Sequence, residues 1–193
     1  MEINMNTFEN YFSNISKRFE MEQDYISEDC IRYDFFYTLS KICKLAPSDL
    51  ILEYPLSKLI NGANPKQEID CVIDKLSFVC ECKFWKKPRT NNPQTKLEGQ
   101  LFDNVFRLHE IKSYKNKWLI VILNDDMLNH LNRRYNLFDI NQDTINIKRE
   151  TLESRPNIFR ENVGDHVFTD ISIKRLFFRN MNNGFSVSIF SIL

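Results

Sequence analysis

Residues 67–85 read QEIDCVIDKLSFVCECKFW, and this stretch decides the fold. It contains two segments rich in β-formers, 67–74 and 77–85, which are separated by polar turn residues. We predict that they form two strands joined as a hairpin through Asp74 to Ser77. The preceding segment LILEYPL, at 50–56, has the same character and predicts a third strand.

Helical spacing is found on both sides of these three strands. Apolar residues recur every three or four positions from 27 to about 45 and again from 95 to about 113, which predicts two helices. WLIVIL at 118–123 is a continuous apolar run, suited to a central strand covered on both faces. The order helix, three strands, helix, strand predicts a mixed α/β domain whose helices cover a sheet.

The outer parts of the chain give weaker patterns. Asn6 and Glu9 resemble an N-cap and its reciprocal partner, and they precede apolar residues at helical spacing, so we predict a helix there. Residues 127–135 predict another helix, whereas TINIKRE (144–150) and GFSVSIFSIL (184–193) predict strands. The stretch between these last two segments is ambiguous.

Composition limits the class of protein. The 193 residues, 42% of them hydrophobic, suit one domain covering 1–193. No apolar run reaches about 18 residues, and the N-terminus MEINMNTFENYF lacks the cationic start of a signal peptide, so we expect no membrane partner and a cytoplasmic location. The 5 cysteines include no C-x2-C pair and are expected to be reduced thiols in the core. Because 26 basic residues balance 26 acidic ones, any nucleic-acid surface must be local.

Three charged side chains of the predicted hairpin converge. Residues two apart on a strand point to the same face, so Glu81 and Lys83 emerge together. Asp70 lies 11 positions before Glu81, enough for one strand and a tight turn to bring it onto the neighbouring strand. Two converging carboxylates can hold Mg²⁺, which prefers oxygen ligands. Phosphodiester hydrolysis needs a hydroxide-like nucleophile and compensation for charge on the phosphate, and this set of residues can supply both.

At these residues the sequence resembles the PD-(D/E)XK, or restriction-endonuclease-like, nuclease superfamily. The signature of that superfamily is Asp, a gap, Glu or Asp, one residue and Lys, which matches Asp70, Glu81 and Lys83. Ile69 stands where the name of the motif has proline. The resemblance implies that Asp70, Glu81 and the carbonyl of Cys82 are ligands of Mg²⁺, with Mn²⁺ as a substitute. It also implies that Lys83 orients the attacking water.

The resemblance extends to the order of elements. It implies a restriction-endonuclease-like core (helix, three strands, helix, strand) over about residues 25–124, with further α and β elements appended C-terminally. The superfamily often has a Glu on its first core helix and a Gln on the helix after the motif, which match Glu28 and Gln100 and add both to the catalytic set. Each has a plainer interpretation. Glu28 can pair with Arg32 four residues on, and Gln100 can be an ordinary exposed helix residue.

Four basic residues follow the hairpin before the next acidic residue, and such a flank can grip the phosphates of DNA: Lys86, Lys87, Arg89 and Lys96. The alternative is a solvated basic loop with Trp85 anchored in the core. Glu81 and Lys83 likewise have an alternative, a salt bridge on a solvated sheet surface. Glu53, in the first predicted strand, either points at the same metal or reaches solvent, and the sequence leaves this open.

The function that the resemblance implies is a Mg²⁺-dependent endonuclease that hydrolyses DNA phosphodiesters, of the restriction type or another defence role. Duplex DNA is then the expected partner, and a palindromic site would favour a homodimer. Two other classes stay open. One is an effector, or toxin, nuclease with little sequence specificity. The other is a non-catalytic module of the same fold, such as a nucleic-acid-binding domain or an immunity protein.

Overall fold

A seven-stranded mixed sheet forms the middle of the computed structural model, which describes residues 3–22, 25–86, 93–139 and 141–193. In the described residues the strands follow in space as β1-β2-β3-β4-β7-β6-β5. Among the strands of the described residues, β3 and β4 run parallel to each other and the other neighbouring pairs are antiparallel. The bounds are β1 Ile51–Pro55, β2 Glu68–Ile73, β3 Phe78–Trp85, β4 Asn116–Asn124, β5 Thr144–Ile147, β6 Ile171–Asn180 and β7 Phe185–Ile192.

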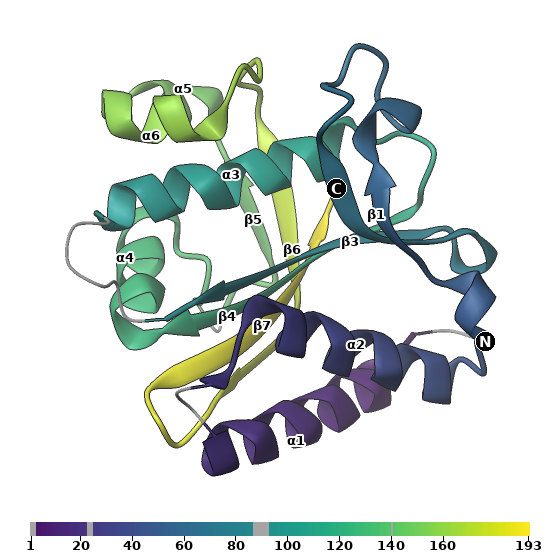
Figure 1. Cartoon of the computed structure of the whole chain (residues 1–193). Coiled ribbons are helices and arrows are strands. Elements are labelled where there is room, and N and C mark those ends of the chain that lie inside the picture. Colours follow the sequence, from purple (N-terminus) through teal and green to yellow (C-terminus); the bar gives the residue numbers. More distant parts are fainter. Residues whose placement is uncertain (1–2, 23–24, 87–92, 140) are drawn as a thin grey trace.

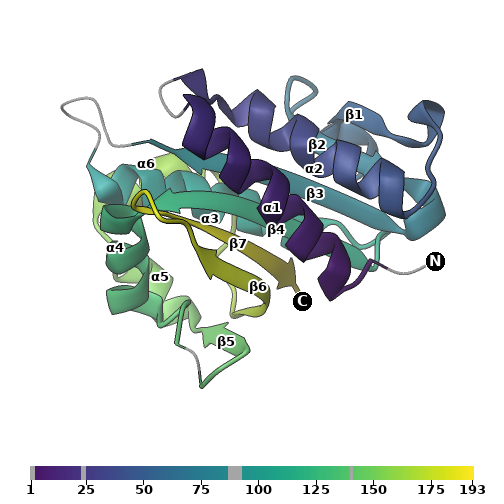
Figure 2. The same ribbon diagram turned by 90° about the horizontal axis from the view of Figure 1, so that it is seen from below.

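Helices cover both faces of this sheet (Figure 1). The helices α1 (Met5–Glu22) and α2 (Glu28–Ile42) lie on one face, and Figure 2 shows them side by side in front of the strands. The other face carries α3 (Gln94–Glu110), α4 (Asp125–Tyr135), α5 (Arg149–Glu153) and α6 (Asn157–Val163). A separate apolar core fills the space on each side. The mixed α/β class is therefore confirmed, and no helix of the described residues has the length and apolar character that a membrane span requires.

The segment that was expected to form the core has the predicted order of elements. From residue 25 to 124 these are α2, β1, β2, β3, α3 and β4, and β4 is central in the sheet. The hairpin is also confirmed, because Ile73 faces Phe78 across a tight turn in which Ser77 adopts a left-handed φ of 45°. The helix α2 begins where predicted, since Ser27 is its N-cap and the Cys30 backbone N–H donates to the Ser27 hydroxyl over 3.3 Å.

Two expectations about the outer segments need correction, and the stretch that the sequence leaves ambiguous contains further elements. The first helix begins at Met5, before Asn6, so Asn6 is not its cap. The predicted strand at 144–150 ends at Ile147. Lys148 is then the N-cap of the short helix α5, which Arg149 and Glu150 begin. The ambiguous stretch contains α6 and a full strand, β6, which pairs with both β5 and β7.

A buried ionic network ties the C-terminal elements to α3. The Glu98 carboxylate is fully buried and accepts two hydrogen bonds from the Arg155 guanidinium, at 2.8 and 2.6 Å. His130 Nε2 lies 2.7 Å from the same carboxylate, and the Tyr135 hydroxyl donates to it. A buried charge is costly unless it is paired and hydrogen-bonded, so these contacts stabilise the packing of α4 and the segment after α5 on α3.

All five cysteines are free, as expected, but they do not share one environment. Cys43, Cys71, Cys80 and Cys82 are buried, which agrees with the prediction of core thiols. Cys30 is only half-buried, in the first turn of α2, where the Ser27 hydroxyl donates to its sulfur over 3.4 Å. This hydrogen bond is the main reason that the pKa of Cys30 is lowered.

Candidate active site

The strands β2 and β3 separate at the residues of the predicted catalytic motif. They pair from Ile73 opposite Phe78 to Cys71 opposite Cys80, and beyond that point β2 pairs only with β1 and β3 only with β4. Asp70 and Glu81 are the first residues past the last pair. The hairpin therefore brings these two carboxylates together where the strands separate. We call this place, with Asp70 on β2 and Glu81 on β3, the fork.

The free edge of β3 is capped by side-chain carboxylates. Beyond the fork the backbone N–H groups of Cys82 and Phe84 have no strand partner on that side. Instead, Cys82 N–H donates to Asp70 Oδ2 over 2.7 Å, and Phe84 N–H donates to Glu28 Oε2 over 3.2 Å. The N–H and C=O of one strand residue point to the same edge, so the carbonyl of Cys82 also points into the fork.

Glu81 is the most deeply buried charged group of the fork. Its residue exposure is 2%, and its Oε1 has no hydrogen-bond donor within the described residues. The nearest cation, Arg107 Nη1, lies 3.6 Å from Oε1, which is too long for a hydrogen bond. Burial, together with the negative charge of Asp70, raises the pKa of Glu81 well above its usual range, despite Lys83 and Arg107. The positive charges of Lys83 and Arg107 therefore do not compensate for the burial of the Glu81 carboxylate beside Asp70.

Lys83 shares the face of Glu81, as strand alternation predicts, and it is held by Glu28. Lys83 Nζ donates to Glu28 Oε1 over 2.9 Å. Burial alone would lower the pKa of Lys83, but the carboxylates of Glu28, Glu81 and Asp70 outweigh burial and leave that pKa raised. Lys83 is therefore an ammonium ion near neutral pH, able to orient a water or an anion but not to accept a proton.

Arg32 is a site residue that the sequence suggested only as a partner for Glu28. Its Nη2 lies 3.0 Å from Asp70 Oδ1 and 3.6 Å from Glu28 Oε1. Its Nη1 lies 3.5 Å from Asp29 and 3.8 Å from the exposed Glu53, which answers the question left open for Glu53: it reaches solvent beside the site. Glu28 therefore pairs with Arg32, as its plainer interpretation expects, and also holds Lys83, while its catalytic role stays a prediction.

A cleft of about 480 Å³ opens beside the fork, between β3 and one stripe of α3. Its walls include Glu28 and Lys83 on one side and Gln100, Asn104 and Arg107 of α3 on the other. Gln100 is exposed at this surface, so the structure brings it to the same cleft as the motif. Gln100, Asn104 and Arg107 are three or four positions apart on α3 and so share one stripe of the helix.

The predicted basic flank is described only in part. Lys86 is exposed, with its Nζ 5.8 Å from the centre of the Phe84 ring, and Lys96 is half-buried in the first turn of α3. Lys87 and Arg89 lie outside the described residues. Trp85 is 6% exposed and belongs to the core, as the alternative interpretation of this segment expects.

The oxygen donors at the fork fit a hard divalent cation. Within the described residues no group of three or more His, Cys, Asp or Glu side chains is arranged to hold a metal. The fork offers two carboxylates and one backbone carbonyl, and Mg²⁺ is commonly bound through one or two carboxylates while it keeps several waters. Glu81 Oε1 is buried and accepts no hydrogen bond, so its lone pairs are available to a metal ion. Asp70 Oδ2 contacts the Cys82 N–H and Asp70 Oδ1 contacts Arg32, and each of these oxygens has a second lone pair that remains available.

Comparisons with protein-family models, with curated proteins and with solved structures gave no match to this chain. The features that bear on function are the side chains gathered at the fork. These are two adjoining carboxylates, an ammonium group on the same face and a polar cleft beside them.

Proposed function

We propose that this chain is a Mg²⁺-dependent nuclease of the PD-(D/E)XK type that hydrolyses phosphodiester bonds of DNA. One observation carries the proposal. Asp70 and Glu81 adjoin at the point where two strands separate, the Lys83 ammonium lies on the same face, and the buried Oε1 of Glu81 lacks a donor. A carboxylate kept buried beside a second one is costly for folding and is typical of a functional site.

In this proposal Asp70, Glu81 and the carbonyl of Cys82 hold the metal ion. When bound there, Mg²⁺ supplies charge neutralisation at the phosphate and a water that deprotonates more easily. Lys83 orients the attacking water and offsets the developing negative charge, while Glu28 fixes its ammonium group. Gln100 and the other polar residues of α3 face the cleft, where they can hydrogen-bond the nucleic-acid backbone.

A second candidate is a non-catalytic module of the same fold. The ion pairs of Arg32 with Asp70 and of Lys83 with Glu28 favour it, because they satisfy two members of the motif without any ligand. They leave Glu81 unsatisfied, however, and a purely structural role offers no reason to bury that carboxylate. For this reason we prefer the nuclease.

The test is incubation of purified protein with supercoiled plasmid in Mg²⁺, with EDTA and Ca²⁺ controls. We expect cleavage in Mg²⁺ or Mn²⁺ and little in Ca²⁺, which takes looser geometry and more ligands. Asp70→Ala and Lys83→Ala should each reduce the rate at least about 100-fold. Glu68→Ala, an exposed carboxylate on the same strand, serves as the matched control. Cutting in EDTA, or wild-type rates in a folded Asp70→Ala variant, would refute the assignment, and labelled RNA in parallel tests the choice of DNA.

A further inference from the structure

Arg107 is placed in the candidate site with hydrogen-bonding capacity to spare. Its side chain is 18% exposed, lines the cleft and pairs with Glu81 at 3.6 Å, a distance too long for a hydrogen bond. Its Nη2 donates to Asp103, one turn earlier on α3. Its Nε is buried and has no acceptor among the described residues. A guanidinium group carries five N–H donors, so most of those on Arg107 are unused.

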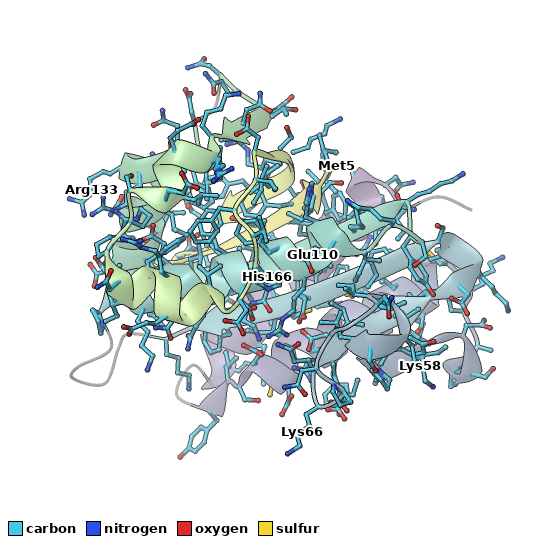
Figure 3. All side chains as sticks on the ribbon, turned by 90° about the horizontal axis from the view of Figure 1, so that it is seen from above. Met5, Lys58, Lys66, Glu110, Arg133 and His166 are labelled. Carbon is cyan, nitrogen blue, oxygen red and sulfur yellow. The ribbon has the colours of Figure 1, made fainter. Side chains whose placement is uncertain are left out.

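The position of Arg107 is fixed by its neighbours on the same stripe of α3, which His166 contacts. His166 Nε2 lies 2.9 Å from Asp103 Oδ1, and His166 Nδ1 lies 2.8 Å from Glu110 Oε1. The imidazole also stacks on Phe106, with 5.4 Å between ring centres and 17° between planes. Figure 3 shows His166 lying over α3 next to Glu110. Asp103 is thus held between His166 and Arg107 and cannot rotate without breaking one of these contacts.

The reaction of the proposed nuclease needs a cation in this place. Negative charge grows on the non-bridging oxygens of the phosphate, and preorganised donors aimed at those oxygens lower the barrier. Of the cleft-lining residues in the described part of the chain, Lys83 and Arg107 are the cations, and Lys83 is already bonded to Glu28. A guanidinium group matches two oxygens of a phosphate better than an ammonium group does.

We propose that Arg107 is a further catalytic residue, which binds a non-bridging oxygen of the scissile phosphate. We propose also that His166 is a positioning residue, which acts on Arg107 through Asp103. This inference rests on the proposed nuclease function and extends it. It gives the C-terminal part of the chain, from which His166 comes, a direct connection to the reaction.

The experiment compares Arg107→Gln and Arg107→Lys with the wild type in steady-state cleavage of a defined duplex. Binding of the same duplex in Ca²⁺ and thermal unfolding are measured in parallel. We expect Arg107→Gln to lower kcat about 100-fold, the usual effect of removing one charge-stabilising donor, with the Kd for duplex changed less than about threefold. Arg107→Lys should recover part of the rate. It also keeps the measurement possible if Arg107→Gln does not fold. Arg149→Gln, an exposed arginine paired with Glu153, is the matched control.

Two further measurements separate the inference from rival explanations. The Mg²⁺ concentration for half-maximal cleavage should stay within about threefold in Arg107→Gln, since the metal ligands are unchanged. A tenfold shift would mean that Arg107 acts on Glu81, and it would overturn the phosphate role. In the wild-type background His166→Ala should lower kcat about tenfold. In the Arg107→Gln background it should lower kcat little further, because the effects of two substitutions that act through the same group are not additive.

The possible failures are distinguishable. If the wild type cleaves and the folded Arg107→Gln variant has the same kcat, the inference about Arg107 is wrong. The proposed nuclease function is then unaffected. Full additivity of His166→Ala with Arg107→Gln would overturn the positioning role. Absence of any Mg²⁺-dependent cleavage by the wild type would refute the proposed function, and the inference with it.

Discussion

Replacing Glu81 with glutamine should stabilise the protein while it abolishes cleavage. The substitution keeps the shape of the side chain and removes a buried negative charge that adjoins Asp70 and whose Oε1 has no donor. An unsatisfied buried polar group costs about 1–3 kcal/mol and more when it is charged, so a neutral amide, which can also donate to Asp70, lowers this cost. Loss of the attraction to Arg107, at 3.6 Å, offsets part of the gain. We therefore expect a net stabilisation of about 1 kcal/mol, or an increase in Tm of about 2–4 °C for a chain of this size.

The sign of the pH dependence follows from the raised pKa of Glu81. The folded state holds the proton to a higher pH than the unfolded state does, so wild-type stability falls as the pH rises from the unfolded pKa through the folded one. Glu81→Gln should not lose stability in this pH range. Its greater free energy of unfolding relative to the wild type should therefore be present near neutral pH and vanish in acid. Thermal and urea unfolding of both proteins without divalent ions, at several pH values, would measure it.

Several results would refute this reasoning. A Glu81→Gln variant less stable than the wild type by about 1 kcal/mol or more would mean that Glu81 forms a net favourable ion pair with Arg107, as in a structural site. Mn²⁺ should raise the Tm of the wild type and not that of the variant. Equal effects of Mn²⁺ on both would remove Glu81 from the ligand set. Glu153→Gln, an exposed carboxylate, should leave the Tm unchanged.

Two further predictions concern stability alone. Glu98→Ala should destabilise the chain by about 3–5 kcal/mol in urea unfolding, because it leaves the buried Arg155 guanidinium without its partner; a loss below about 1 kcal/mol would contradict this. For His166, burial lowers the pKa but Asp103 and Glu110 outweigh it, so the pKa is raised on folding. The stability that the paired His166 contributes is complete below the pKa of the unfolded state, and it is lost as the pH rises through the pKa of the folded state. In urea unfolding, the free energy of unfolding of the wild type should exceed that of His166→Gln near neutral pH, and this difference should shrink in alkaline buffer. A difference that does not change with pH would contradict the pairing of His166 with Asp103 and Glu110.

Local sequence patterns predicted the first two thirds of the chain well. In β2 and β3 short runs of β-formers are bounded by polar turn residues, and in α2 a capping serine precedes an apolar stripe. The strand β6 was missed for a physical reason. A register shift between Arg175 and Phe177 interrupts the alternation of buried and exposed residues, so no period of two runs through it. The helix α5 has five residues, too few to show a helical period.

The candidate site was predictable to the extent that it depends on neighbouring strands. Asp70, Glu81 and Lys83 converge because a hairpin and strand alternation bring them together, and both can be seen in sequence. Arg107 and His166 could not be assigned in this way. His166 lies 63 positions from Asp103, and its contact depends on how the C-terminal segment crosses α3. A lone histidine in a loop gives no local signal of such a contact.

The unequal exposure of the five thiols makes the protein convenient to label. Cys30 is half-buried with a lowered pKa, whereas the other four thiols are buried, so a maleimide dye should react with Cys30 first. Cys30 stands two positions after Glu28, the carboxylate that holds Lys83 and caps β3. A fluorophore attached there would sit in the first turn of α2, on a different side of the helix from Glu28, in the unmutated protein. A change in its emission on mixing with Mg²⁺ or a duplex in stopped-flow experiments would test whether α2 responds to the ligands of the proposed function.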